Sequence, residues 1–339
     1  MSQRTLIVPA ASPGRTGAAD WRRAATLSEF YGDSGFETVG LCVRKDKAPP
    51  GGERAAALRG AFDHCAFTAP EAADDALAMI AHRYGFAVAH FAGEPARPSE
   101  HILSAVILCD KGPVSEEGAA DICVSFEGAD GEGGVIAAPL LRRAARLTRA
   151  RIASGGRILA GCWVEDDPRA IDAAKALFQA IAVKGGGYGP NFALAGPGAA
   201  LVSPPRLPNP PTIMPASVSE RVFYRGVDIA LFPDAPTGEA AHLPRYDVLT
   251  ALEYGATPMV SDSALVGLKP HWRLPRFATL EQLAEYLFEE GKALREGGLM
   301  AELRARADWT WSGLSGASAS QRSRLIGAIR DKIAERRKG

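Results

Sequence analysis

The stretch ALEYGATPMVSDSA, residues 251–264, predicts the end of a helix, a glycine, a short strand and a polar exit. Ala251 and Leu252 suit an apolar helix face, and Gly255 supplies the left-handed residue that often ends a helix. Residues 257–260 then favour a short buried strand, and residues 261–263 a polar turn. A helix–glycine–strand unit of this kind is typical of a crossover in a parallel sheet.

Short apolar runs alternate with amphipathic segments on both sides of this stretch. Strands are predicted at 5–8, 37–44, 64–69, 86–93, 104–112, 119–128, 134–139, 156–164, 191–198, in the second half of 217–235, and at 257–260. Helices are predicted at 17–35, 70–85, 166–187, in the first half of 217–235, and at 246–254, 279–316 and 320–338, and the proline-rich stretch 204–216 predicts no regular element.

This alternation predicts an α/β protein with two doubly wound, Rossmann-like parallel-sheet domains. We expect a first domain at 1–145, a second at 155–316, and a C-terminal helix at 317–339 that returns to the first. We expect the two domains to face each other across a cleft, and clefts between domains are the usual place for a ligand. In such sheets ligands bind outside the carboxyl ends of the strands, where helix N-termini offer N–H groups to anions.

The composition narrows the class of protein. The chain has 339 residues, 47% of them apolar, with 39 basic against 39 acidic side chains, so dedicated nucleic-acid binding is not expected. The five cysteines form no C-x-x-C pair, and the histidines are scattered, so free thiols and no metal site are expected. No apolar run is long enough to cross a membrane, and we expect a cytoplasmic protein.

Two polar features stand out against this background. Asp110 ends an apolar strand, where a carboxylate could act as a base toward an acceptor hydroxyl or could simply close a turn. Residues 142–157 contain six arginines. As an amphipathic helix this stretch could contact an anionic membrane surface or a diphosphate acceptor, whereas a charged, solvated helix near the domain junction is the simpler explanation.

The order of DIALFPD, YDVLTALEYG, TPMVSDSA and RARADWTWSGL resembles the donor-nucleotide domain of GT-B glycosyltransferases. The similarity is to the large bacterial retaining family (group 1, family 4-like), and it covers about 155–316. The segments GRILAGCWV and NFALAGPG resemble its earlier strands. The resemblance implies a nucleotide-diphosphate sugar as donor substrate, no separate cofactor, and a saccharide, lipid-linked or small-molecule acceptor.

The resemblance also implies site residues. His90 matches the position of a family histidine near the sugar, so His90 and Asp110 are the predicted catalytic residues. The ribose-binding position falls on Thr250, and Arg245 is the best basic residue in the donor loop. The predicted donor-binding residues are Gly161, Gly196, Asp234, Glu239, His242, Arg245, Asp247, Thr250 and Glu253.

Three functions remain in competition. The first is a glycosyltransferase of undetermined stereochemistry. The second is a GT-B-shaped binding or partner subunit without catalysis, which fits the absence of the family's ribose-binding glutamate and of its basic pair after residue 161. The third, a nucleotide-dependent oxidoreductase, fits poorly because ASPGRTGAAD follows the first strand in place of G-x-G-x-x-G.

Overall fold

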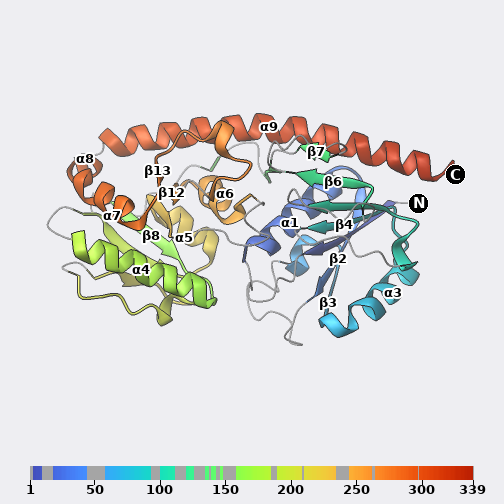
Figure 1. Cartoon of the computed structure of the whole chain (residues 1–339), viewed down its shortest axis with the longest axis horizontal. Helices are drawn as coiled ribbons and strands as arrows, with labels where there is room; N and C mark the ends of the chain where they lie inside the picture. Colours follow the sequence, from blue (N-terminus) through green and yellow to red (C-terminus); the bar gives the residue numbers. More distant parts are fainter. Residues whose placement is uncertain are drawn as a thin grey trace. The chain divides into compact units, whose positions relative to one another are not determined.

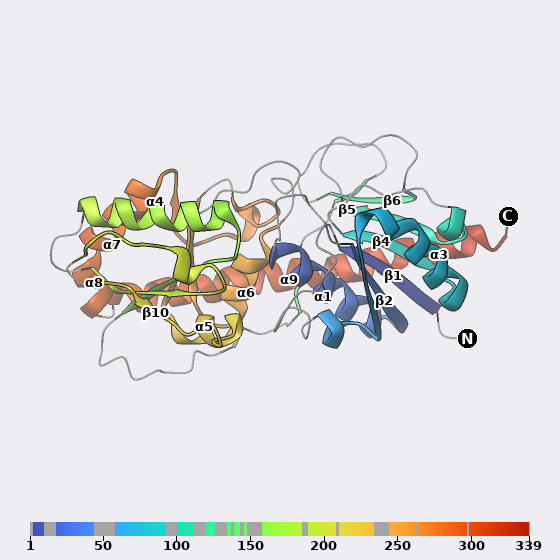
Figure 2. The ribbon, with the colours of Figure 1, turned by 90° about the horizontal axis from the view of Figure 1, so that it is seen from below.

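The computed structural model contains two compact units (Figures 1 and 2). Unit 1 comprises Met1–Arg142, Gly238–Tyr246 and Gly316–Gly339, and unit 2 comprises Arg143–Thr237 and Asp247–Ser315. The structure describes residues 3–9, 18–43, 58–92, 100–110, 120–125, 134–136, 139–142, 146–147, 158–184, 189–207, 210–233, 244–261, 264–296 and 298–338.

Unit 1 contains a parallel sheet in the order β3-β2-β1-β4-β5-β6-β7. The strands are β1 Gln3–Pro9, β2 Phe36–Val43, β3 His64–Thr68, β4 Val88–Ala92, β5 Val106–Asp110, β6 Ile122–Ser125 and β7 Gly134–Ile136. The helices of this unit include α1 Ala18–Asp33 and α3 Ala73–Tyr84, with single 3-10 turns η1 Pro70–Ala72 and η2 Glu100–Ile102.

Unit 2 contains a second parallel sheet, in the order β10-β9-β8-β11-β12-β13. The strands are β8 Leu159–Trp163, β9 Asn191–Ala195, β10 Thr212–Ile213, β11 Ile229–Phe232, β12 Thr257–Ser261 and β13 Arg276–Phe277. Its helices are α4 Pro168–Lys184, α5 Glu220–Gly226, α7 Leu280–Glu289 and α8 Gly291–Glu296, with 3-10 turns η3 Ala199–Leu201 and η6 Lys269–His271.

Both sheets run outward from their first strand in one direction and then return to its other side. The reversal occurs between β1 and β4 in unit 1 and between β8 and β11 in unit 2. In open α/β sheets this switch point leaves a crevice outside the carboxyl ends of the two strands, and ligands bind there. The predicted fold class, two doubly wound parallel-sheet domains, is therefore confirmed.

The two faces of the unit 1 sheet differ in chemistry. One face is an apolar core in which residues such as Leu6, Ala89 and Phe91 pack with Leu77 and Ile80 of α3. The other face lies against α1, where buried polar side chains are common. Since strand side chains alternate between faces, every second residue of β4 and β5 meets this polar layer.

One helix belongs to both units. α9 Gly298–Arg336 is continuous, so the predicted break between 316 and 320 is wrong. Its buried residues keep helical spacing on both sides of that point: Leu303, Ala307, Trp311 and Leu314 in unit 2, and Leu325, Ile329 and Ile333 in unit 1. No proline interrupts 312–320, and this packing outweighs the cost of about 1 kcal/mol for each helical glycine. Among the described residues, no helix is both long and apolar enough to cross a membrane.

The proline-rich stretch also differs from its prediction. Thr212 and Ile213 form the short strand β10 beside β9, and the N–H of Met214 continues the pairing by donating to the carbonyl of Leu194 at 2.8 Å. These three residues have backbone N–H groups, whereas Pro211 and Pro215 on either side do not. The prolines therefore limit the strand but do not exclude it.

Candidate functional site

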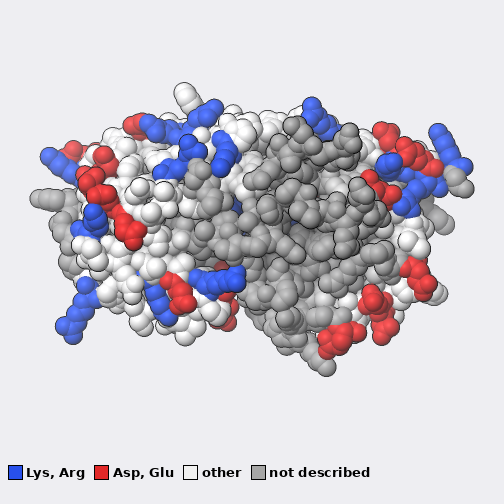
Figure 3. All heavy atoms as spheres, in the orientation of Figure 1, with Lys and Arg blue, Asp and Glu red and all other residues white. Residues whose placement is uncertain are grey.

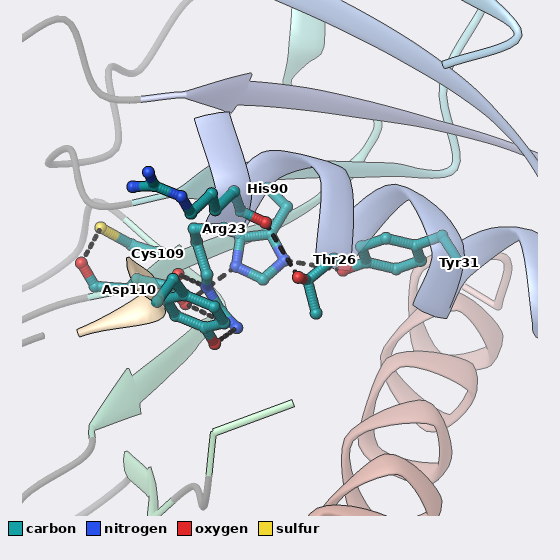
Figure 4. A network of polar contacts seen from close by, with 8 residues as sticks. Arg23, Thr26, Tyr31, His90, Cys109 and Asp110 are labelled. Carbon is teal, nitrogen blue, oxygen red and sulfur yellow. Dashed lines mark hydrogen bonds and ion pairs between the residues drawn. The ribbon is translucent and has the colours of Figure 1, made fainter. Parts of the chain in front are cut away.

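The two predicted catalytic residues are neighbours on the face of the unit 1 sheet that α1 covers (Figure 4). His90 is the third residue of β4, two positions before the end of this strand at Ala92, and Asp110 is the last residue of β5. His90 alternates with Ala89 and Phe91, which belong to the apolar core on the other face. Both polar side chains are buried, so each depends on protein partners for its hydrogen bonds.

Both ring nitrogens of His90 have such partners. Nδ1 lies 2.9 Å from the hydroxyl of Tyr31 on α1, and Nε2 lies 2.9 Å from Oδ1 of Asp110. An ionised carboxylate can only accept, so Nε2 of His90 donates to Asp110, and Nδ1 shares a hydrogen bond with the hydroxyl of Tyr31. Burial, followed by the charge of Asp110, raises the pKa of Tyr31 well above its usual value, which keeps this hydroxyl protonated.

Asp110 is clamped by an arginine of α1. Arg23 donates from Nε to Oδ2 at 2.7 Å and from Nη2 to Oδ1 at 3.0 Å. Its remaining terminal nitrogen, Nη1, donates to the hydroxyl of Tyr246. Burial alone would raise the pKa of Asp110, but electrostatic attraction to Arg23 and His90 and the hydrogen bonds from both side chains hold that pKa well below its usual range. The carboxylate is therefore ionised and fully engaged.

These contacts favour a positioning role for both residues over direct proton transfer. Both ring nitrogens of His90 are engaged by protein groups. Asp110 is a weak base because its pKa is held low. The catalytic roles inferred from the sequence stay predictions.

Arg23, Tyr31 and Tyr246 were not predicted from the sequence. Burial disfavours the charged form of Arg23, yet Asp110 and Tyr246 outweigh it and raise the pKa of this side chain. One signal was present in the sequence. Arg23 lies four residues before Leu27 and seven before Phe30, on the apolar stripe of the predicted helix. An arginine on such a stripe indicates a buried partner.

Two of the predicted donor-binding residues of unit 2 are glycines, one directly after a strand and one within a strand. Gly196 follows β9 with φ +102, and a Cβ there would lie 2.4 Å from the carbonyl oxygen of Val164. Only glycine fits this close turn between the exits of β9 and β8. Gly161, in the middle of β8, is different, because a Cβ there would meet the side chains of Phe223 and Val227 at 2.5 and 2.6 Å. Gly161 thus makes room for α5, and its predicted donor contact stays a prediction.

The predicted donor loop leads into α6 Tyr246–Glu253. Asp234, Glu239 and His242 lie outside the described residues. Arg245 directly precedes α6 and is buried, Asp247 is in the first turn, and Thr250 is half-buried one turn later. The carboxylate of Asp247 accepts from the N–H of Val248 at 2.9 Å. The structure thus gathers three of the predicted donor residues at the first turn of one helix and just beyond it.

Glu253 lies at the other end of α6. With a rise of about 1.5 Å per residue, seven residues separate it from Tyr246 by roughly 10 Å along the helix. Here Arg146 donates to the carbonyls of Leu252 and Ala256 at 2.7 and 2.8 Å, which satisfies groups that a helix C-terminus leaves open. Glu253 is itself buried and belongs to this capped end.

Three other helices of unit 2, namely α4, α5 and α7, have a side chain that accepts a hydrogen bond from a backbone N–H of their first turn. Asp167 accepts from the N–H of Arg169 at the start of α4. Ser219 and Thr279 accept in the same way at α5 and α7. These are ordinary N-caps. α6 instead follows Arg245, so side-chain charge and helix dipole both favour an anion at its start, and Asp247 in the first turn carries the opposite charge.

Two arginines of the stretch 142–157 lie among the described residues. Arg142 donates to Glu29 at 2.9 Å, and Arg146 binds the end of α6 and Asp308 of α9. Both guanidinium groups therefore bind the protein itself, and the described residues 139–142 and 146–147 are not helical. On the face in Figure 3, basic and acidic side chains occur side by side over the described parts of both units. The predicted membrane contact otherwise falls outside the described residues.

Other ligand chemistry finds less support. Among the described residues, no group of three or more His, Cys, Asp or Glu side chains could hold a metal ion, and none of the five cysteines forms a disulfide. A cavity of about 720 Å³ lies at the amino ends of β1, β4 and β5, lined in part by Arg4 and Arg336. Arg4 donates to the Tyr84 carbonyl, and Arg336 forms an ion pair with Asp121. These guanidinium groups already have partners.

The sequence matches no protein-family model and no curated protein. Its structure is similar to solved glycosyltransferases. AviGT4, involved in avilamycin A biosynthesis, has 14% identity and a TM-score of 0.56 over 98% of both chains. The UDP-forming α,α-trehalose-phosphate synthase of Burkholderia vietnamiensis has 13% identity and a TM-score of 0.56 over 99% of this chain and 98% of its own.

A third similar structure is Phytolacca americana UGT2 in complex with UDP-2-fluoroglucose and pterostilbene. It has 11% identity and a TM-score of 0.53 over 98% of this chain and 99% of its own. At these identities the likeness concerns the fold, and it extends over nearly the whole length of each chain. The chain has the two-domain GT-B fold.

Proposed function

We propose that this protein is a glycosyltransferase that moves a sugar from a nucleoside-diphosphate donor to a saccharide, lipid-linked or small-molecule acceptor. The observation that carries the proposal is the start of α6. It combines Arg245 with the positive end of a helix, and it follows β11, one of the two strands at the switch point of unit 2. An anionic ligand is the chemistry that this arrangement favours.

The similar structures support the class of donor. One is named as UDP-forming and another is bound to UDP-2-fluoroglucose, so two chains of this fold handle uridine diphosphate sugars. For this chain we propose that the diphosphate binds beside Arg245 and the ribose near Thr250, and Gly196 stays a predicted donor-binding residue. The loop that holds Asp234, Glu239 and His242 would complete the donor site.

The chemistry follows from charge. In sugar transfer the bond between the anomeric carbon and the diphosphate oxygen breaks, the acceptor oxygen bonds to that carbon, and the acceptor loses a proton. Negative charge grows on the leaving diphosphate. A guanidinium can form two parallel hydrogen bonds to such a group, and helix N–H groups add fixed positive potential. Arg245 and the start of α6 would thus stabilise the leaving group.

The test is calorimetric titration with UDP, GDP, TDP and ADP, followed by measurement of sugar transfer or donor hydrolysis with the nucleotide that binds. Arg245→Ala should lower turnover by about a hundred- to thousandfold, the usual loss for one such electrostatic donor. The control is Arg225→Ala. Arg225 is exposed in the last turn of α5, at the opposite end of the sheet from the strand exits, and its loss should leave both binding and turnover unchanged.

The outcomes are distinct. Absence of binding by any of these nucleotides at millimolar concentration would contradict the proposal. Tight binding without transfer or hydrolysis would favour the binding or partner subunit. Near-full turnover of Arg245→Ala would mean that the diphosphate lies elsewhere.

A further inference from the structure

A chain of buried side chains ends at the first residue of α6. It runs from Tyr31 through His90 and Asp110 to Arg23 (Figure 4). Arg23 then donates to the hydroxyl of Tyr246. These residues come from α1, β4, β5 and the start of α6, and all are buried. Tyr246 belongs to unit 1, whereas the next residue of the same helix belongs to unit 2.

We infer that Arg23 is a positioning residue that fixes the start of α6 through the hydroxyl of Tyr246, and so holds Arg245 and the helix N-terminus in place for an anionic donor. The inference rests on the proposed function for its consequence, but not for its geometry. None of these five side chains needs to touch the donor.

The geometry of the guanidinium group makes this role possible. Arg23 binds Asp110 through two nitrogens, which fixes the plane of its side chain. The third nitrogen then points in a set direction, and the hydroxyl of Tyr246 accepts from it. The guanidinium carbon also lies 5.3 Å from the centre of the Tyr246 ring, so the ring and its hydroxyl are both held by the same cation.

Burial keeps the ion pair between Arg23 and Asp110 in one geometry. The side chains of Arg23 and Asp110 are 6% and 0% exposed, and a charge pair so little exposed to water keeps its geometry because separation would leave both charges unpaired. The first turn of a helix, in contrast, has few hydrogen bonds of its own. A rigid support at Tyr246 therefore stabilises the part of α6 that most easily frays.

The decisive variant is Tyr246→Phe, with Tyr31→Phe as its matched control. Each change removes one buried hydroxyl from the same network and leaves the ring in place. Only Tyr246 lies on α6, whereas Tyr31 lies on α1 and binds His90. A role in stability alone predicts similar losses of binding for the two variants, and the positioning role predicts a difference.

We expect Tyr246→Phe to raise the Kd for the bound nucleoside diphosphate by about tenfold, the weight of one charge-assisted hydrogen bond. Tyr31→Phe should leave this Kd unchanged. Hydrogen exchange of the peptide 246–254 should rise in Tyr246→Phe and stay at the wild-type rate in Tyr31→Phe. The exchange measurement needs no ligand.

Each result bears on one claim. Equal exchange in the two variants would overturn the inference whether or not a nucleotide binds. Wild-type binding by Tyr246→Phe would overturn it and leave the proposed function standing. If the wild-type protein binds no nucleotide, the proposed function fails. Faster hydrogen exchange limited to Tyr246→Phe would even then be evidence that Arg23 holds the start of α6 in place.

Discussion

The two sheets have the same strand order near their first strand but use polar groups in opposite ways. At the strand ends of unit 1, Arg23, Asp110 and His90 are charged or polar, buried and bound to one another. At the described strand ends of unit 2, a glycine turn and side-chain N-caps dominate. The difference teaches that a cluster of ionisable residues near strand ends can serve the architecture of the protein and need not bind a ligand.

The largest effect should come from breaking the ion pair of unit 1. Asp110→Ala leaves Arg23 as an uncompensated buried charge and should lower the free energy of unfolding by about 3–5 kcal/mol. Urea denaturation measures this loss. Asp172→Ala, on the exposed side of α4, is the control and should change stability by less than about 0.5 kcal/mol. A small effect at Asp110 would mean that unit 1 does not depend on the pair.

Asp110 also gives stability a pH dependence with a defined sign. The pKa of Asp110 is lowered in the folded protein, whereas an unfolded aspartate titrates near about 4. The stabilisation is therefore fully present above about pH 4 and is lost as the pH falls toward the folded pKa. Asp110→Asn removes this contribution, so its stability should decline less between about pH 4 and 2 than that of the wild type.

The next effect lies in unit 2. Gly196→Ala places a Cβ against the carbonyl of Val164 at a positive φ, and we expect a loss of about 1–3 kcal/mol from the backbone alone. Gly327→Ala in α9 is the matched control, because it meets no atom within 4 Å and should stabilise the helix by about 0.5–1 kcal/mol. Thermal melts of both variants should thus shift in opposite directions. A shift in the same direction would show that the turn is not constrained.

The smallest effect concerns His90 and decides its role. His90→Phe removes two hydrogen bonds and should cost about 1–3 kcal/mol of stability, while turnover per folded molecule falls by less than about tenfold. A double-mutant cycle with Tyr31→Phe should show coupling, since the two side chains are partners. A fall in turnover of about a hundredfold or more, with binding unchanged, would show that His90 takes part in proton transfer.

The order of strands and helices could be predicted from the sequence because each element carries its own period. The alternation predicted the strands of both sheets, apart from β10 and β13. These two are two residues long, too short for a period to be visible. The continuity of α9 could not be predicted, since glycines and serines at 312–320 lower the local helix propensity and only packing in both units compensates.

The candidate site was predicted less completely. His90 and Asp110 were chosen because they lie near strand ends, and both do lie on one face of one sheet. Their partner Arg23 is 87 residues from Asp110 and 223 residues from Tyr246, and no local pattern links these positions. For Arg245, Asp247 and Thr250 the sequence predicted a shared helix start, because they lie within six residues of one another.

By itself, then, the sequence determined which segments are strands and helices, and with them two doubly wound domains, because local periodicity and turn residues encode these features directly. Only the tertiary structure decided which polar groups are bound to one another. The carboxylate of Asp110 could have faced an acceptor, but the packing of α1 on the sheet brings Arg23 to it. A buried charge takes the partner that packing supplies, and in unit 1 that partner comes from the protein itself.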